Sequence, residues 1–62
     1  MKVNFYKTRG ISIKNASLIT RAILDYIPQK GLYIKFFEQE FAVNRVYYDI
    51  TNDECNVYMM RV

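Results

Sequence analysis

The chain has 62 residues, of which 52% are hydrophobic and 16% aromatic, and nine basic against six acidic side chains give it a net charge of +3. This composition excludes an intrinsically disordered chain, and no apolar run is long enough for a membrane-spanning helix or a signal peptide. We expect one domain, residues 1–62, of marginal stability, because a chain of this size buries only about 60% of the surface that it exposes when unfolded.

The first predicted element is a strand that contains Val3 and Phe5. These apolar residues alternate with more polar neighbours, which is the period of a half-buried strand. A turn or bulge is expected at residues 8–10, where a glycine is free to adopt a positive φ. The strand is expected to resume at Ile11 and Ile13 after that irregularity.

A helix is predicted over residues 16–27. Asn15 is a suitable helix cap, since its side-chain oxygen can accept a hydrogen bond from an early backbone N–H. Pro28 cannot continue the helical hydrogen-bond ladder, and Gly31 allows the chain to reverse. The apolar residues recur at the helical period and form one continuous stripe: Leu18, Ile19, Ala22, Ile23, Tyr26 and Ile27.

A second strand is predicted over residues 32–37, where aliphatic and aromatic residues alternate. The phase then breaks, because the inward positions up to Phe36 are even whereas the next large apolar residue, Phe41, is odd. We interpret residues 38–40 as a bulge, which moves every later side chain to the opposite face. A short helix there is an alternative, because Glu and Gln are good helix formers.

A three-stranded meander is predicted for the rest of the chain. A tight turn at residues 44–45 and a loop at residues 51–54 join its strands. The resulting register places Ile50 opposite Cys55. It also gathers one apolar face across two independent turns: Phe41, Val43, Val46, Tyr48, Ile50, Cys55, Val57 and Met59.

These elements predict an α+β fold in β-α-β-β-β order, with one helix packed on one face of a small, mainly antiparallel sheet. The helix covers the apolar face, and no element remains to cover the other. A contiguous aromatic patch on a small domain marks an interface, and Tyr, Phe, Met and Arg are enriched at interface cores. The expected partner-binding residues are Tyr33, Lys35, Tyr47, Tyr58, Met60 and Arg61, with Tyr6 and Phe37 behind them.

The first functional hypothesis is a non-enzymatic protein-binding module that acts by occluding a partner surface. Its open aromatic face or an edge strand docks on another protein or on a second copy of the chain, as in a homodimer. By size and architecture the chain resembles the compact accessory proteins of bacteriophages and mobile elements, among them anti-CRISPR proteins and inhibitors of host polymerases or restriction enzymes. That resemblance implies an inhibitor of a host system.

The alternative hypothesis is single-stranded nucleic-acid binding. Residues 1–35 carry seven basic side chains and one acid, whereas residues 36–62 carry two basic side chains and five acids. The basic residues could neutralise phosphates while tyrosines stack on bases. A helix on an aromatic sheet resembles the RNA-recognition-motif domains, although the glycine-aromatic signature of that family and its second helix are absent from this sequence.

We expect no enzymatic activity, no metal and no cofactor. The chain has no histidine, and the neighbouring acids Glu38 and Glu40 are typical of solvated surface charge. The lone thiol, Cys55, has no histidine to activate it, and the predicted register buries it, where a thiol is ordinarily inert. A single cysteine also indicates a reducing compartment, and we therefore expect a cytoplasmic protein.

Overall fold

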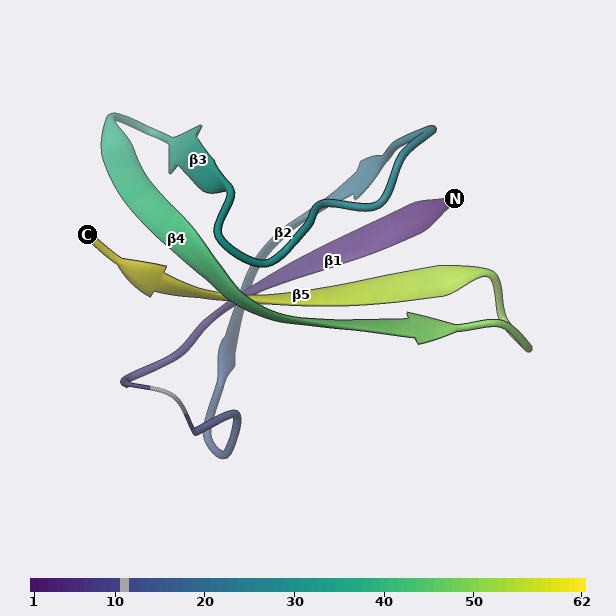
Figure 1. The fold of residues 1–62 in the computed structure, drawn as a ribbon, viewed down its shortest axis with the longest axis horizontal. Helices are drawn as coiled ribbons and strands as arrows, with labels where there is room; N and C mark the ends of the chain where they lie inside the picture. Colours follow the sequence, from purple (N-terminus) through teal and green to yellow (C-terminus); the bar gives the residue numbers. More distant parts are fainter. Residues whose placement is uncertain (11) are drawn as a thin grey trace.

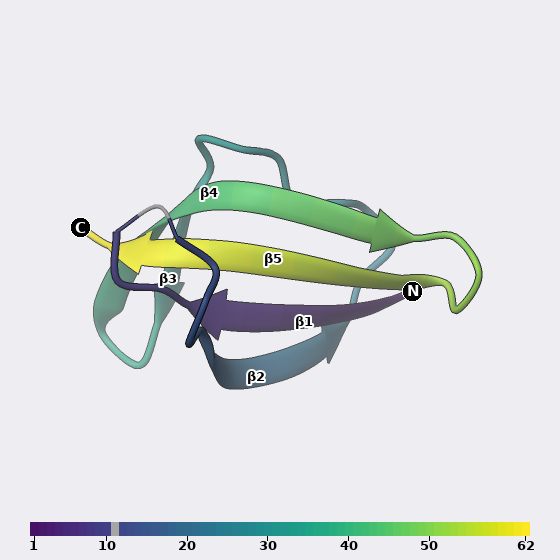
Figure 2. The same ribbon diagram turned by 90° about the horizontal axis from the view of Figure 1, so that it is seen from below.

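The computed structural model of the chain describes residues 1–10 and 12–62. Its five strands are β1 (Lys2–Lys7), β2 (Ser17–Ile23), β3 (Tyr33–Phe36), β4 (Gln39–Asp49) and β5 (Glu54–Arg61). They form one sheet in the order β2-β1-β5-β4-β3 (Figure 1). The central strands β1 and β5 are parallel, and the other neighbouring pairs are antiparallel. Figure 2 shows β2, β1, β5 and β4 side by side in that order.

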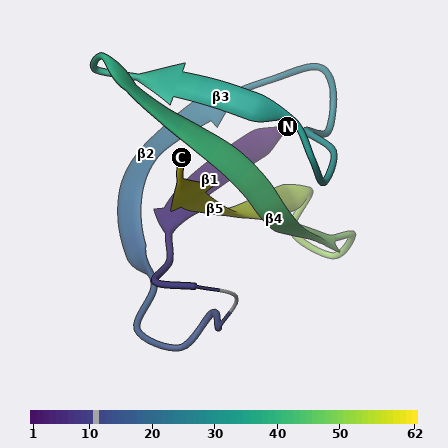
Figure 3. The same ribbon diagram turned by 60° about the vertical axis from the view of Figure 1, so that its left-hand side comes forward.

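The sheet curls into a half-barrel that encloses one of its faces, which we call the inner face. Phe5 of β1 and Phe36 of β3 meet edge to face with ring centroids 5.2 Å apart, although β5 and β4 lie between their strands. Figure 3 shows β4 crossing in front of β1 and β5, with β3 above them, as a result of this curl. The inner face holds the buried core, which consists of Val3, Phe5, Phe41, Val43, Cys55, Val57 and Met59.

The connection between β2 and β3 completes the core in place of a helix. It runs from one edge of the sheet to the other, because β2 and β3 are the two edge strands. Leu24 and Ile27 pack against the buried core, and Pro28 is itself fully buried. The connection is held at both ends, since the Leu24 N–H donates to the Met1 carbonyl (3.0 Å) and the Gly31 N–H donates to the Val43 carbonyl (2.9 Å).

The helix predicted over residues 16–27 is wrong. Residues 17–23 form the edge strand β2, in which Ala22 lies opposite Val3 of β1. Two members of the predicted buried stripe, Leu18 and Ile23, are 42% and 76% exposed. The β-branched residues of this segment favour an extended backbone, and pairing with β1 decides the outcome. Within the described residues no helix occurs, so the predicted α+β fold is replaced by an all-β fold.

The predicted turn and the predicted bulge have exchanged places. The chain reverses at Phe37 and Glu38, whose φ angles of 49° and 68° are those of a tight hairpin turn, and not at residues 44–45. The bulge lies at Asn44, where the register of β4 against β5 shifts. Both features change the phase of side-chain alternation in the same way, so the same residues still reach the inner face.

The last loop lies one residue earlier than predicted, and the register moves with it. Tyr48 lies opposite Cys55, the position predicted for Ile50, and Ile50 is 81% exposed in the loop. The predicted strands around Val3 and over residues 32–37 are confirmed as β1 and β3. Ile13, by contrast, lies in the loop between β1 and β2, and the strand residue expected at Ile11 falls outside the described residues.

Candidate functional site

Three tyrosines on the outer face of the sheet pack against one another, and we call them the tyrosine cluster: Tyr6, Tyr47 and Tyr58. Tyr6 and Tyr58 are directly paired across β1 and β5, and their rings stack with centroids 5.1 Å apart and planes 17° apart. Tyr47 of β4 meets Tyr58 edge to face at 5.9 Å. Arg45, opposite Tyr58, donates from Nη1 to the Tyr47 hydroxyl (3.4 Å).

The tyrosine cluster is partly open to solvent. Tyr6 and Tyr58 are half-buried, and Tyr47 is 48% exposed. Burial raises the pKa of Tyr58, and charge on Tyr6 or Tyr47 would raise it further. The Tyr58 hydroxyl is therefore neutral at physiological pH and can donate or accept hydrogen bonds but cannot act as a base.

A polar row beside the tyrosine cluster fixes the centre of the outer face. Asn4, which is 2% exposed, donates from Nδ2 to Asn56 Oδ1 (2.9 Å) and to Glu54, and it accepts from Nε of Arg21 at 3.1 Å. Among the described residues every buried side-chain N or O atom has a hydrogen-bond partner. The row is therefore a satisfied structural network that holds β2, β1 and β5 together.

The structure brings some of the predicted partner-binding residues together and separates others. Met60 lies opposite Ala42, which in turn lies opposite Tyr33, so the outer face continues from the tyrosine cluster to β3. Arg61 lies opposite the buried Phe41, so strand alternation places it on the other side of the sheet from Met60. Outer-face positions are thus held by Tyr6, Tyr33, Lys35, Tyr47, Tyr58 and Met60.

The β3–β4 turn carries the remaining predicted residue, Phe37. Its side chain is 85% exposed, and its positive φ is rare for a bulky residue. Lys35 forms an ion pair with Glu38 across this turn at 3.6 Å, but both side chains are largely exposed. Such a pair contributes little to stability, so Lys35 stays available to a partner.

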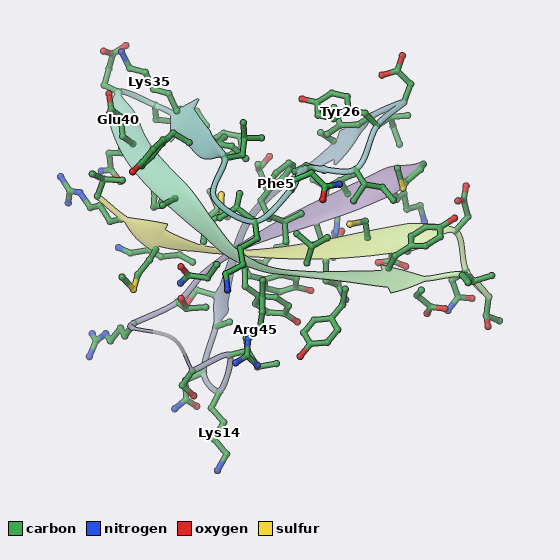
Figure 4. The ribbon with its side chains drawn as sticks, viewed as in Figure 1. Phe5, Lys14, Tyr26, Lys35, Glu40 and Arg45 are labelled. Atoms are coloured by element: carbon green, nitrogen blue, oxygen red, sulfur yellow. The ribbon has the colours of Figure 1, made fainter. Side chains whose placement is uncertain are left out.

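The sequence suggested Arg45 only as a residue at the frame of the partner contact, whereas the structure places it beside the tyrosine cluster. The sequence predicts a turn at residues 44–45, but the bulge at Asn44 aligns Arg45 with Tyr58 on the outer face. Figure 4 shows Arg45 and Lys14 at one end of the molecule, and Lys35 and Glu40 at another. The sequence carries no signal for this placement, because a one-residue bulge and a two-residue turn change side-chain alternation in the same way.

The described residues offer no arrangement for metal chemistry or for a reactive thiol. In that part of the chain no three His, Cys, Asp or Glu side chains lie together as metal ligands. Cys55 is fully buried, and its burial raises the pKa of the thiol, so the thiolate is disfavoured. Glu38 and Glu40 are exposed.

Comparison of the chain with protein-family models, curated proteins and solved structures found no significant match. The interpretation as an inhibitor of the bacteriophage or anti-CRISPR kind rested on the size of the chain and on an α+β architecture, and the five-stranded sheet replaces that architecture. Nothing supports that interpretation or the homodimer, and both are withdrawn. No helix in the described residues is long and apolar enough to cross a membrane.

Proposed function

We propose that the chain is a non-enzymatic binding module that docks another protein onto its outer face, centred on the tyrosine cluster. The observation that carries this proposal is the packing of Tyr6, Tyr47 and Tyr58 against each other while they remain partly exposed. Rings that already pack against one another lose little conformational entropy on binding. Tyr and Arg are also among the residue types enriched at interface hot spots. The module acts by covering a partner's surface.

The expected partner surface combines apolar side chains with carboxylates. The tyrosine cluster supplies aromatic area, while Arg45 lies at its β4 side and Leu18 lies opposite Tyr6 on β2. An acidic partner is attracted by Arg45 and by the basic side chains of strands β1 and β2, whose own residues include no acid. A cytoplasmic location belongs to the same proposal, because the single free thiol of Cys55 suits a reducing compartment.

Single-stranded nucleic acid is the second candidate partner, and the acid-free basic sequence of residues 1–24 favours it. Stacking on a base requires a free ring face. Tyr6 and Tyr58 each cover one face of the other, and Tyr58 also receives the edge of Tyr47. These contacts leave less ring area for bases than an open tyrosine offers, and we therefore favour a protein partner.

Photo-crosslinking from defined positions in cells tests the proposal. A photoreactive phenylalanine analogue replaces Tyr47 in the tyrosine cluster or, as the control, the exposed Ile50 in the β4–β5 loop. We expect a discrete crosslinked protein from position 47 and not from position 50. Arg45→Glu in the same background should weaken capture at least about tenfold, whereas Lys30→Glu, on the β2–β3 connection, should not.

Two results would overturn a protein partner. One is the same set of products, or none, from positions 47 and 50. The other is a product from position 47 that disappears after nuclease treatment, which would establish nucleic acid as the ligand of this face.

A further inference from the structure

We propose that the loop between β1 and β2 forms an anion site that binds a phosphate group. A cavity of about 510 Å³ lies at this loop and is lined by Arg9, Ser12, Lys14, Asn15 and Ser17. Its size is in the range of small-molecule sites in proteins. Every lining side chain is polar, and together they offer a guanidinium, an ammonium, two hydroxyls and an amide.

The charge around the cavity is of one sign. Among the described residues neither Arg9 nor Lys14 has a carboxylate within ion-pair distance. Lys7 adds a third positive charge nearby, since it is paired with the lining residue Ser17. The acids of the chain lie elsewhere: Asp25 in the β2–β3 connection, Glu38 and Glu40 in the β3–β4 hairpin, and Asp49, Asp53 and Glu54 around the β4–β5 loop.

Residues 8–10, at the start of the loop, are fastened to the sheet beside the cavity. The Thr8 N–H donates to the Met59 carbonyl at 2.8 Å, and the Thr8 hydroxyl donates to the Gly10 carbonyl at 2.8 Å. Thr8 itself is buried. On the other side, Nδ2 of Asn44 in the β4 bulge donates to the Gly10 carbonyl (3.4 Å).

Phosphate is the anion that this set of groups fits best. A guanidinium can engage two phosphate oxygens at once, and an ammonium adds a point charge on a flexible stem. The hydroxyls and the amide can donate to the remaining oxygens, and the Lys14 N–H already donates to Ser12 Oγ, which orients that hydroxyl (3.2 Å). The site includes no residue of the tyrosine cluster, so a negative result for one proposal does not affect the other.

Titration of the isotope-labelled protein, followed by backbone amide chemical shifts, tests this inference. The probes are inorganic phosphate, adenosine monophosphate and a ten-nucleotide oligothymidine. We expect inorganic phosphate to saturate below about 10 mM, with shifts concentrated in residues 8–17. Arg9→Gln and Lys14→Gln should each weaken binding by about tenfold or more. Lys30→Gln, an equal loss of charge outside the site, should leave it unchanged.

The relative affinities of the probes identify the source of the phosphate group. Tighter binding of the monophosphate than of the oligonucleotide identifies a free or terminal phosphate, and the reverse order identifies a phosphodiester backbone. The inference is overturned if phosphate shifts spread over all basic residues, if no saturation occurs, or if Lys30→Gln weakens binding as much as Lys14→Gln. Each variant must retain the dispersed spectrum of the folded chain; if a Gln variant unfolds, Lys14→Arg, which keeps the charge, should still bind.

Discussion

Phe5 and Phe36 meet edge to face at a centroid distance of 5.2 Å, although two strands of the same sheet separate them. Only a strongly curled sheet can bring its second and fifth strands into contact. The contact closes the inner face, and Phe41 extends it at 6.4 Å from Phe36. The described residues therefore bury a core without a helix, and the outer face with its tyrosine cluster is left open to solvent.

Mutation of this aromatic pair should reveal energetic coupling across the half-barrel. In a double-mutant cycle of Phe5→Leu and Phe36→Leu, we expect a coupling energy of about 0.5–1.5 kcal/mol, because edge-to-face pairs contribute that much beyond area burial. Urea unfolding gives the four free energies. In the matched cycle with the exposed neighbour Phe37→Leu, the effects should add within about 0.5 kcal/mol. Equal coupling in both cycles contradicts the curl.

Adjacent methionines should differ sharply in their contribution to stability. Met59 is fully buried on the inner face, whereas Met60 lies on the outer face and is half-buried. Met59→Ala should lower the free energy of unfolding by about 2–5 kcal/mol, enough to leave a marginal domain largely unfolded. Met60→Ala should cost at most about 1 kcal/mol. A larger loss at Met60, measured by urea or thermal unfolding, would reverse the assignment of the two faces.

The β3–β4 turn should tolerate glycine better than its own residues. Phe37 and Glu38 both have positive φ, which glycine adopts without the steric cost that other residues bear. Glu38→Gly should therefore raise the free energy of unfolding by roughly 0.5–1 kcal/mol. Glu40→Gly, in strand β4, should lower it by a similar amount. Destabilisation by both substitutions would place the turn elsewhere.

The hydroxyls of Tyr48 and Tyr58 should lose their protons at a higher pH than an ordinary phenol does. The hydrogen bond from Tyr48 to Asp53 (2.8 Å) raises the pKa of Tyr48 above its usual 10.0, and burial raises that of Tyr58. Because the pKa of each group is higher in the folded than in the unfolded state, its contribution to stability is complete below pH 10. That contribution is lost as the pH rises through the folded-state pKa. Tyrosinate absorbance at alkaline pH measures both pKa values, and the variants Tyr48→Phe and Tyr58→Phe assign each transition to its residue.

The control is Asp53→Asn, which removes the charged acceptor of the Tyr48 hydroxyl. It should bring the Tyr48 pKa back toward its ordinary value and leave that of Tyr58 where it was. A Tyr48 pKa that stays high in this variant assigns the shift to another cause.

Side-chain alternation predicted the two faces of the sheet better than it predicted the connections. A two-residue turn and a one-residue bulge both reset the phase of alternation, so the residues around positions 37–38 and 44 could exchange roles without moving Val43 or Phe41 from the inner face. What separates the two features is backbone geometry. Positive φ at two consecutive residues, here Phe37 and Glu38, has no signature when neither residue is Gly, Asn or Asp.

The helix over residues 16–27 failed for a different reason. Its apolar spacing fits a helical stripe as well as it fits a strand followed by an irregular connection, and β2 carries a second irregularity, a register shift opposite the step from Phe5 to Tyr6. The spacing of apolar residues contains no information about the hydrogen-bond partners that β1 supplies. The positions of Tyr6, Tyr47 and Tyr58 on one face survived this error, because they depend on strand alternation alone.

The all-β half-barrel depends on the pairing of residues 17–23 with β1, which extends the curled sheet. Nuclear Overhauser contacts measure this directly in solution. We predict contacts between Val3 and Ala22, between Phe5 and Thr20, and between the rings of Phe5 and Phe36. Contacts between residues three and four apart along residues 17–27, without those to β1, would restore the helix and contradict the all-β half-barrel.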